Sequence, residues 1–115
     1  MDIKEQEKKN ITELYHYMCE SEGVKPLKVY FGNVGRGGAL CAYKKLRNGK
    51  ITSLYIKIDL CRICIGAAWV LCHEMAHQLE IDENCNATHN YKFKSREKKL
   101  IKKYTNCSHA KKLIF

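Results

Sequence analysis

The sequence predicts a small α+β domain with the order helix, about three strands, helix, helix. Two observations carry this prediction. Apolar residues recur at helical spacing in three segments, and alternating residues with turn signals mark three extended segments between the first two helices. We expect the strands to form a meander and hence a mainly antiparallel sheet. A chain of 115 residues supports one core, so residues 1–115 are expected to form a single domain.

The first helix is expected over residues 3–21, where four apolar residues form one stripe: Ile11, Leu14, Tyr15 and Met18. Strands are predicted over residues 27–31, 39–46 and 51–58. The Asn48-Gly49 pair between the last two is typical of a hairpin turn.

The second helix is expected over residues 66–81, with an apolar face made of Ala68, Leu71, Cys72, Met75 and Leu79. Residues 82–90 have the composition of a polar loop. The third helix is expected over 91–104, with its lysines facing outward and four residues facing the core: Phe93, Leu100, Ile101 and Tyr104. Residues 105–115 end in Leu113-Ile114-Phe115, and we expect a short strand, a flexible tail or a segment that covers a cleft.

Composition indicates a soluble, intracellular protein, of the cytoplasm, nucleoid or nucleus, without a membrane segment; we expect a monomer. The first ten residues lack the apolar region of a signal peptide, and the apolar run at 63–72 is too short to span a bilayer. Seven cysteines, an odd number, favour reduced thiols over a disulfide framework. The net charge is +9, and residues 89–112 hold nine lysines and arginines against Glu97 alone. Such a basic face over 92–112 fits DNA, although a solvated lysine-rich helix face fits the pattern equally well.

The stretch VLCHEMAHQL (70–79) has the spacing of a zinc-binding helix. His73 and His77 are four residues apart, so both imidazoles leave the same helix face and can bind one ion. Glu74 is turned by about 100° around the helix axis, beside the metal but not ligating it. This is the arrangement of a zinc peptidase, in which Glu74 acts as the general base.

A catalytic zinc needs a third protein ligand and one open position. Eight downstream residues carry suitable atoms: Glu80, Asp82, Glu83, Cys85, His89, Glu97, Cys107 and His109. His89 follows a loop long enough to bring it back to the helix, and it is therefore favoured over a glutamate and, next, a cysteine. Tyr43, Tyr91 and Arg36 are candidates to stabilise an oxyanion.

Several stretches together resemble the SprT-like zinc metallopeptidase family, which includes the Spartan DNA–protein crosslink proteases. The resemblance covers about residues 27–100 and rests on four motifs: GALCAY (38–43), SLYIKIDL (53–60), VLCHEMAHQL (70–79) and HNYKF (89–93). It implies a zincin-like fold, Zn²⁺ held by His73, His77 and His89, and hydrolysis of peptide bonds in proteins bound or crosslinked to DNA.

The sequence also departs from the family pattern. Asn90 replaces the glycine that follows the third histidine, and asparagine is the next most tolerant residue of a left-handed backbone. No paired Cys-x-x-Cys zinc ribbon is present. Cys61-x-x-Cys64 could form a second metal site with Cys107 and His109, although buried thiols are the favoured interpretation.

Two other functions therefore stay open. One is a minimal gluzincin-type peptidase, in which a glutamate is the third ligand and the cleft is self-blocked. The other is a non-catalytic, zinc-containing nucleic-acid-binding module.

Overall fold

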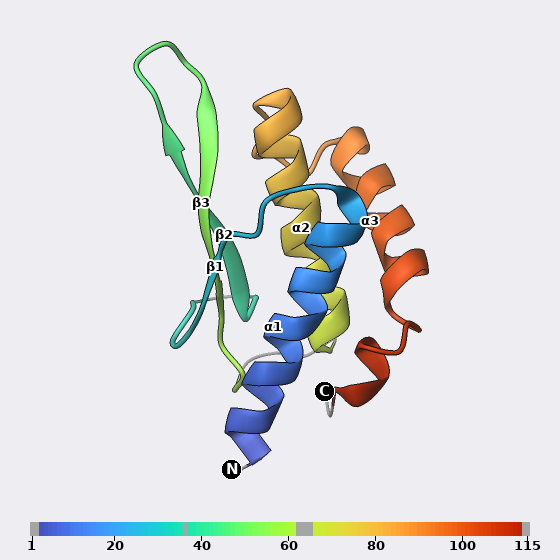
Figure 1. Ribbon diagram of the computed structural model, residues 1–115. Helices are drawn as coiled ribbons and strands as arrows, with labels where there is room; N and C mark the ends of the chain where they lie inside the picture. The colour runs from blue at the N-terminus through green and yellow to red at the C-terminus, as the bar shows by residue number, and fades with distance from the viewer. Residues whose placement is uncertain (1–2, 36, 62–65, 114–115) are drawn as a thin grey trace.

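All three helices lie on one side of a three-stranded sheet (Figure 1). The computed structural model describes residues 3–35, 37–61 and 66–113. Its elements are, in chain order, α1 (Ile3–Glu22), β1 (Lys28–Phe31), β2 (Ala39–Lys45), β3 (Ile51–Ile58), α2 (Ala67–Asn84), α3 (Tyr91–Tyr104) and the 3₁₀ turn η1 (Ala110–Lys112). The predicted α+β class and the order of helices and strands are confirmed.

The sheet is mixed rather than a meander, which corrects the predicted topology. Its strand order is β1-β3-β2, with β1 parallel and β2 antiparallel to β3. The connection between β1 and β2 leaves room for β3 between them, and the side chain of Asp59 anchors it by accepting a hydrogen bond of 3.3 Å from the Val34 backbone N–H. The central strand β3 is consequently the most buried, with Ile56 and Ile58 fully inaccessible to solvent.

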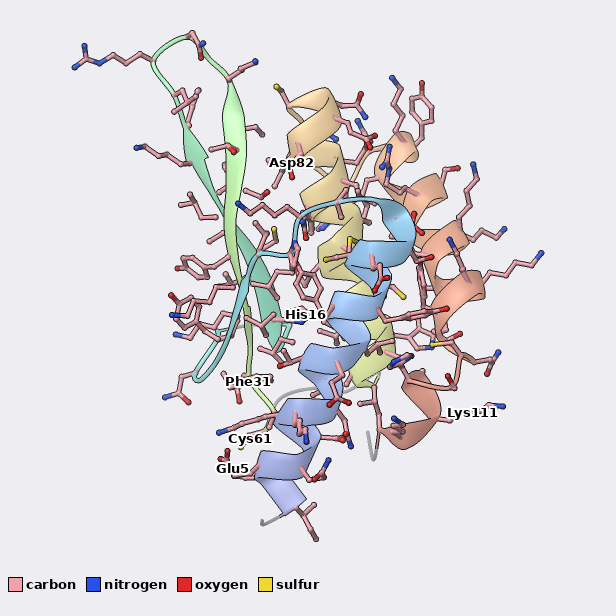
Figure 2. The ribbon with its side chains drawn as sticks, in the orientation of Figure 1. Glu5, His16, Phe31, Cys61, Asp82 and Lys111 are labelled. Atoms are coloured by element: carbon pink, nitrogen blue, oxygen red, sulfur yellow. The ribbon has the colours of Figure 1, made fainter. Side chains whose placement is uncertain are left out.

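The predicted hairpin between β2 and β3 is confirmed. The Leu46 N–H donates to the Lys50 carbonyl at 2.7 Å, and Gly49 adopts a φ of 86°, a conformation that glycine reaches without strain. Figure 2 shows side chains extending from both faces of the sheet, although helices cover only one of them.

The apolar stripe predicted for the first helix forms a large part of the core. Ile11, Leu14, Tyr15 and Met18 are all fully buried. Burial of each such side chain contributes about 1.5–3 kcal/mol to folding. The Tyr15 hydroxyl also donates to Gln78 Oε1 at 2.6 Å, which ties α1 to the middle of α2.

Helix α2 continues three residues beyond its predicted end, to Asn84, so the polar loop is shorter than predicted. The apolar period is lost after Ile81, but other contacts hold the last turn. Asp82 accepts hydrogen bonds from the backbone and side chain of Ser53, and Glu83 pairs with Arg96 at 2.6 Å. The helix then ends at Cys85, whose left-handed conformation lets its N–H donate to the Ile81 carbonyl.

Of the tail, the described residues 105–113 include no strand and none that lines the cleft, and η1 packs against α1. Residues 110–112 form η1, and the Asn10 side chain donates to the Lys112 carbonyl at 3.4 Å. The His109 ring stacks on Tyr17, with 4.5 Å between ring centroids. Residues 114–115 of the apolar end lie outside the described residues. Within the described chain, no helix is both long and apolar enough to cross a membrane.

Candidate metal centre

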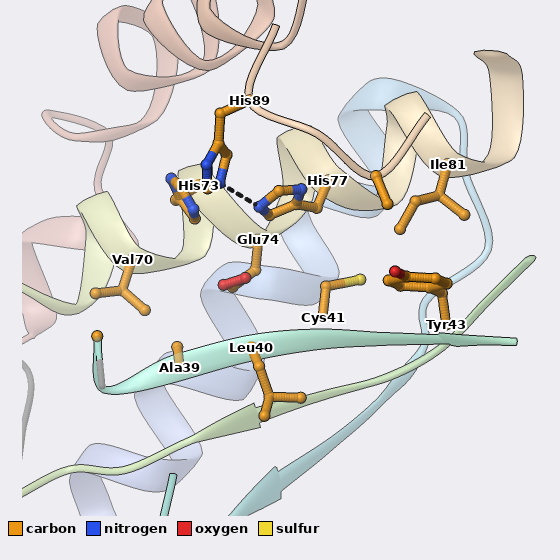
Figure 3. A pocket seen from close by; sticks show the side chains of 12 residues that line it. Ala39, Leu40, Cys41, Tyr43, Val70, His73, Glu74, His77, Ile81 and His89 are labelled. Atoms are coloured by element: carbon orange, nitrogen blue, oxygen red, sulfur yellow. Dashed lines mark hydrogen bonds between the residues drawn. The ribbon is translucent and has the colours of Figure 1, made fainter. Parts of the chain in front are cut away.

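Three histidines from two elements converge at one point beside α2. His73 and His77 leave the same face of α2, and His89 reaches them from the loop before α3 (Figure 3). One potential ligand atom of each lies within 4.8 Å of the others. The structure thus brings together the three residues that the sequence predicts as metal ligands.

The distances between the imidazoles fit a small cation. Nε2 of His77 lies 2.9 Å from Nε2 of His89. Two imidazole nitrogens that bind one tetrahedral zinc ion are about 3.3 Å apart, so a slight separation of the rings would accommodate the ion. The donor set, three imidazole nitrogens, is also the one that zinc accepts in catalytic sites.

Glu97 on α3 holds the His73 ring in place. Its carboxylate lies 2.5 Å from Nδ1 of His73. Because Nδ1 is engaged, Nε2 is the nitrogen that His73 can offer to a metal. The sequence predicted Glu97 only as an alternative ligand and missed this role. The available signal was its isolation, since Glu97 is the only acidic residue between 89 and 112.

Phe93 forms the base on which the three imidazoles rest. Its ring centroid lies 5.0 Å from that of His73, 4.4 Å from His77 and 4.8 Å from His89. Phe93 itself is buried, at 1% exposure. The first turn of α3 is fixed by Asn90, whose side chain accepts from the Phe93 N–H at 3.0 Å.

Asn90 is therefore a helix cap in an extended conformation, with a φ of −73°. The expectation that it stands in for a left-handed glycine is wrong.

Glu74 lies below the histidines, and its carboxylate points into the gap between α2 and β2 (Figure 3). Its exposed fraction is only 3%. Burial, and secondarily the negative charge of Glu97, raises the pKa of Glu74 to about 8. The environment of His77 lowers the pKa of its imidazole, whereas that of Glu74 is raised. Burial, followed by the nearby His73 and His89, lowers the pKa of His77 to about 4, so its nitrogen lone pair is free at neutral pH.

A cleft of about 500 Å³ opens beside Glu74 and the histidines. Its other wall is β2, from which Cys41 and Tyr43 point toward α2 (Figure 3). Burial, with Glu74 next in effect, raises the pKa of Cys41 to about 12, so in the metal-free protein this cysteine is a neutral thiol.

Of the two candidates for oxyanion stabilisation that the structure describes, Tyr43 lies at the cleft. Tyr91 is 76% exposed and lines a separate groove along α3. Arg36 lies outside the described residues.

Apart from Glu97, several of the other potential third ligands have partners of their own away from the histidines. Glu80 is buried and lies 3.4 Å from the Arg96 guanidinium, and Asp82 binds Ser53. Cys107 donates to the carbonyl of Tyr104, away from the histidines. Cys64 is among the residues that the structure does not describe, and within the described ranges the three histidines form the only cluster suited to a metal.

Comparison of the chain with protein-family models, with curated proteins and with solved structures finds no match.

Proposed function

We propose that the protein is a zinc-dependent endopeptidase of the kind that the SprT-like resemblance implies. The observation that carries the proposal is the convergence of His73, His77 and His89 beside a buried glutamate in an open cleft. A structural zinc site is closed by four protein ligands, whereas three ligands leave one position for water or substrate. Among the described residues, no fourth His, Cys, Asp or Glu joins the three imidazoles, and they face a cleft.

An extended peptide is the substrate that fits this cleft. Strand β2 forms one wall and is an edge strand, so one side of its backbone is free to pair with another chain. A peptide paired with β2 would run past Glu74 and the histidines. Tyr43, which is half exposed at the same wall, could donate its hydroxyl proton to the carbonyl oxygen of the substrate.

Zinc held by His73, His77 and His89 would lower the pKa of a water ligand and polarise the scissile carbonyl. Glu74 accepts a proton from the attacking water while the oxygen of that water bonds to the carbonyl carbon. The same carboxyl then gives that proton to the amide nitrogen as the C–N bond breaks. Glu97, which contacts Nδ1 of His73, would leave Nε2 of that ring available to bind the metal.

The further proposal of a DNA-bound protein substrate rests on α3. Its exposed lysines are Lys92, Lys94, Lys98, Lys99, Lys102 and Lys103. The single acidic residue of the helix, Glu97, is turned inward to His73. Glu22 pairs with Lys103 and Glu83 with Arg96, which leaves the other lysines of α3 as its outward charges. A DNA backbone on these lysines would bring its bound proteins close to the cleft.

The Glu74→Gln variant tests the proposal. It should retain one zinc per chain by elemental analysis, because Glu74 is no ligand, and lose hydrolysis of a fluorescently labelled unfolded protein by about 10²- to 10⁴-fold. Glu20→Gln, an exposed change on α1, is the matched control. If the zinc-loaded wild type cleaves neither free nor DNA-bound protein faster than Glu74→Gln, the endopeptidase proposal fails, and the non-catalytic binding module takes its place.

A further inference from the structure

The face of the sheet opposite the helices is uncovered. Side chains that are directly opposite in the register share a face, and the pairs Leu40–Lys57, Ala42–Tyr55 and Tyr30–Lys57 point away from the fully buried Ile56 and Ile58. We call this surface the open sheet face; its residues are Lys28, Tyr30, Leu40, Ala42, Tyr55 and Lys57. In the described part of the chain no helix packs on it (Figures 1 and 2).

Aromatic rings and lysines alternate on this face. Tyr30 lies on the edge strand β1, and its ring is 43% exposed. It contacts Tyr55 edge to face, with 5.3 Å between the ring centroids. The Lys28 ammonium lies 5.1 Å from the centre of the Tyr30 ring. Lys57 lies beside Gly32, where an added Cβ would approach Cε of Lys57 to 3.2 Å. The lysine stems therefore pack on the sheet and hold their charges at its surface.

The segment 24–58 that contains the sheet carries only positively charged side chains, and two of them, Lys28 and Lys57, lie on the open sheet face. Residues 24–58 contain no aspartate or glutamate. They contain eight basic residues, namely Lys25, Lys28, Arg36, Lys44, Lys45, Arg47, Lys50 and Lys57. A sheet that merely needed a soluble outer face would be expected to mix both signs. This charge selects a polyanionic partner.

We infer that the open sheet face binds a single-stranded nucleic acid. Unpaired bases stack on exposed aromatic rings, and lysines between the rings neutralise the phosphates, which is the combination found on single-strand-binding surfaces. A duplex hides its bases and gains only the charge contacts. An anionic membrane would also attract the lysines, so vesicles form one arm of the test below. This inference goes beyond the proposed hydrolysis and does not depend on it.

The open sheet face is separate from both the cleft and the basic face of α3. Cys41 and Tyr43 leave β2 on the cleft side, whereas Leu40 points to the other side (Figure 3). Helix α3 packs on α2 and lies on the far side of α2 from the sheet (Figure 1). A strand bound on the open sheet face would therefore leave the cleft accessible to a peptide.

The test is fluorescence anisotropy of a labelled oligodeoxythymidine of about 15 nucleotides titrated with the zinc-loaded protein. Single-stranded DNA should bind more tightly than a duplex of equal length. Tyr30→Ala should weaken binding about tenfold, Tyr30→Phe should retain it, and Tyr91→Ala, the matched exposed tyrosine on α3, should leave it unchanged. Glu74→Gln should bind as the wild type does, so a failure of the hydrolysis proposal remains distinguishable.

A pair of lysine changes keeps the test decisive if Tyr30→Ala does not fold. Lys28→Gln with Lys57→Gln should reduce the slope of log affinity against log salt by about 1.4, and Lys98→Gln with Lys102→Gln should change it less. The inference is overturned if only the α3 pair weakens binding, or if the duplex binds as tightly as the single strand. Tyr30-dependent binding to phosphatidylserine vesicles without binding to the oligonucleotide would equally overturn it, in favour of a membrane.

Discussion

Replacing Glu74 by glutamine should stabilise the metal-free protein, and the gain should depend on pH. In the folded chain the carboxyl has a pKa of about 8, against 4.5 for an ordinary glutamate. Below pH 4.5 this carboxyl is protonated in both the folded and the unfolded protein, and it then has no electrostatic cost to folding. As pH rises from 4.5 to 8, the unfolded state ionises first, so the wild type loses stability over this window.

The magnitude follows from the pKa difference. At about 1.4 kcal/mol for each pH unit, the wild type loses roughly 3 kcal/mol by pH 7 relative to acid conditions. The glutamine amide of the variant does not titrate, so the stability advantage of Glu74→Gln should grow by about 3–4 kcal/mol between pH 5 and pH 8. Groups that titrate in both proteins cancel in this comparison.

Urea denaturation of chelator-treated wild type and variant, at several pH values, measures this difference. Zinc provides the internal control, because a nearby cation favours the ionised carboxylate and should flatten the pH dependence. An advantage that is constant from pH 5 to pH 8 would refute the reasoning, because it would mean that Glu74 is solvated in the metal-free protein.

Three further predictions address the surroundings of the site. Glu97→Gln should weaken zinc binding about 10- to 100-fold in a chelator competition, because His73 loses its orienting partner. The control Glu83→Gln should leave the zinc affinity unchanged. Equal zinc affinities for the wild type and Glu97→Gln would contradict this role of Glu97. Phe93→Ala should lower the free energy of unfolding, measured in urea, by about 3–5 kcal/mol. It should also weaken zinc binding, because all three imidazoles pack on its ring. Full zinc affinity in a destabilised variant would show that Phe93 does not position the imidazoles. Lys98→Gln with Lys102→Gln should lower the salt slope of duplex DNA binding by about 1.8, and an unchanged slope would remove α3 from the DNA interface.

The parts of the site that depend on one helix could be predicted from the sequence. The spacing of His73 and His77 places them on one face of any helix. The apolar residues at 71, 72, 75 and 79 predict the helix itself, because they recur at helical spacing. The length of the loop before His89 and the motif resemblance favoured it as the third ligand, but no local period shows where a loop returns. Its convergence with the other two depends on the cap at Asn90, which sets the start of α3.

Features that depend on packing between elements could not be predicted in the same way. The contact of Glu97 with His73 exists only because α3 lies along α2. The order of the strands could not be predicted either, because the alternation of residues shows which face of β3 is buried but not which strand is its neighbour. The last turn of α2 was missed because Asp82 and Glu83 are held by Ser53 and Arg96, which are distant in sequence.

X-ray absorption spectroscopy of the zinc-loaded protein tests the central claim most directly. The number of imidazole rings around zinc can be counted from their multiple scattering, and sulfur ligands are recognised by their longer distance of about 2.3 Å. We expect three imidazoles and one oxygen ligand at about 2.0–2.1 Å, from His73, His77, His89 and solvent. Two imidazoles with added oxygen ligands, or any sulfur in the coordination shell, would contradict the proposed centre.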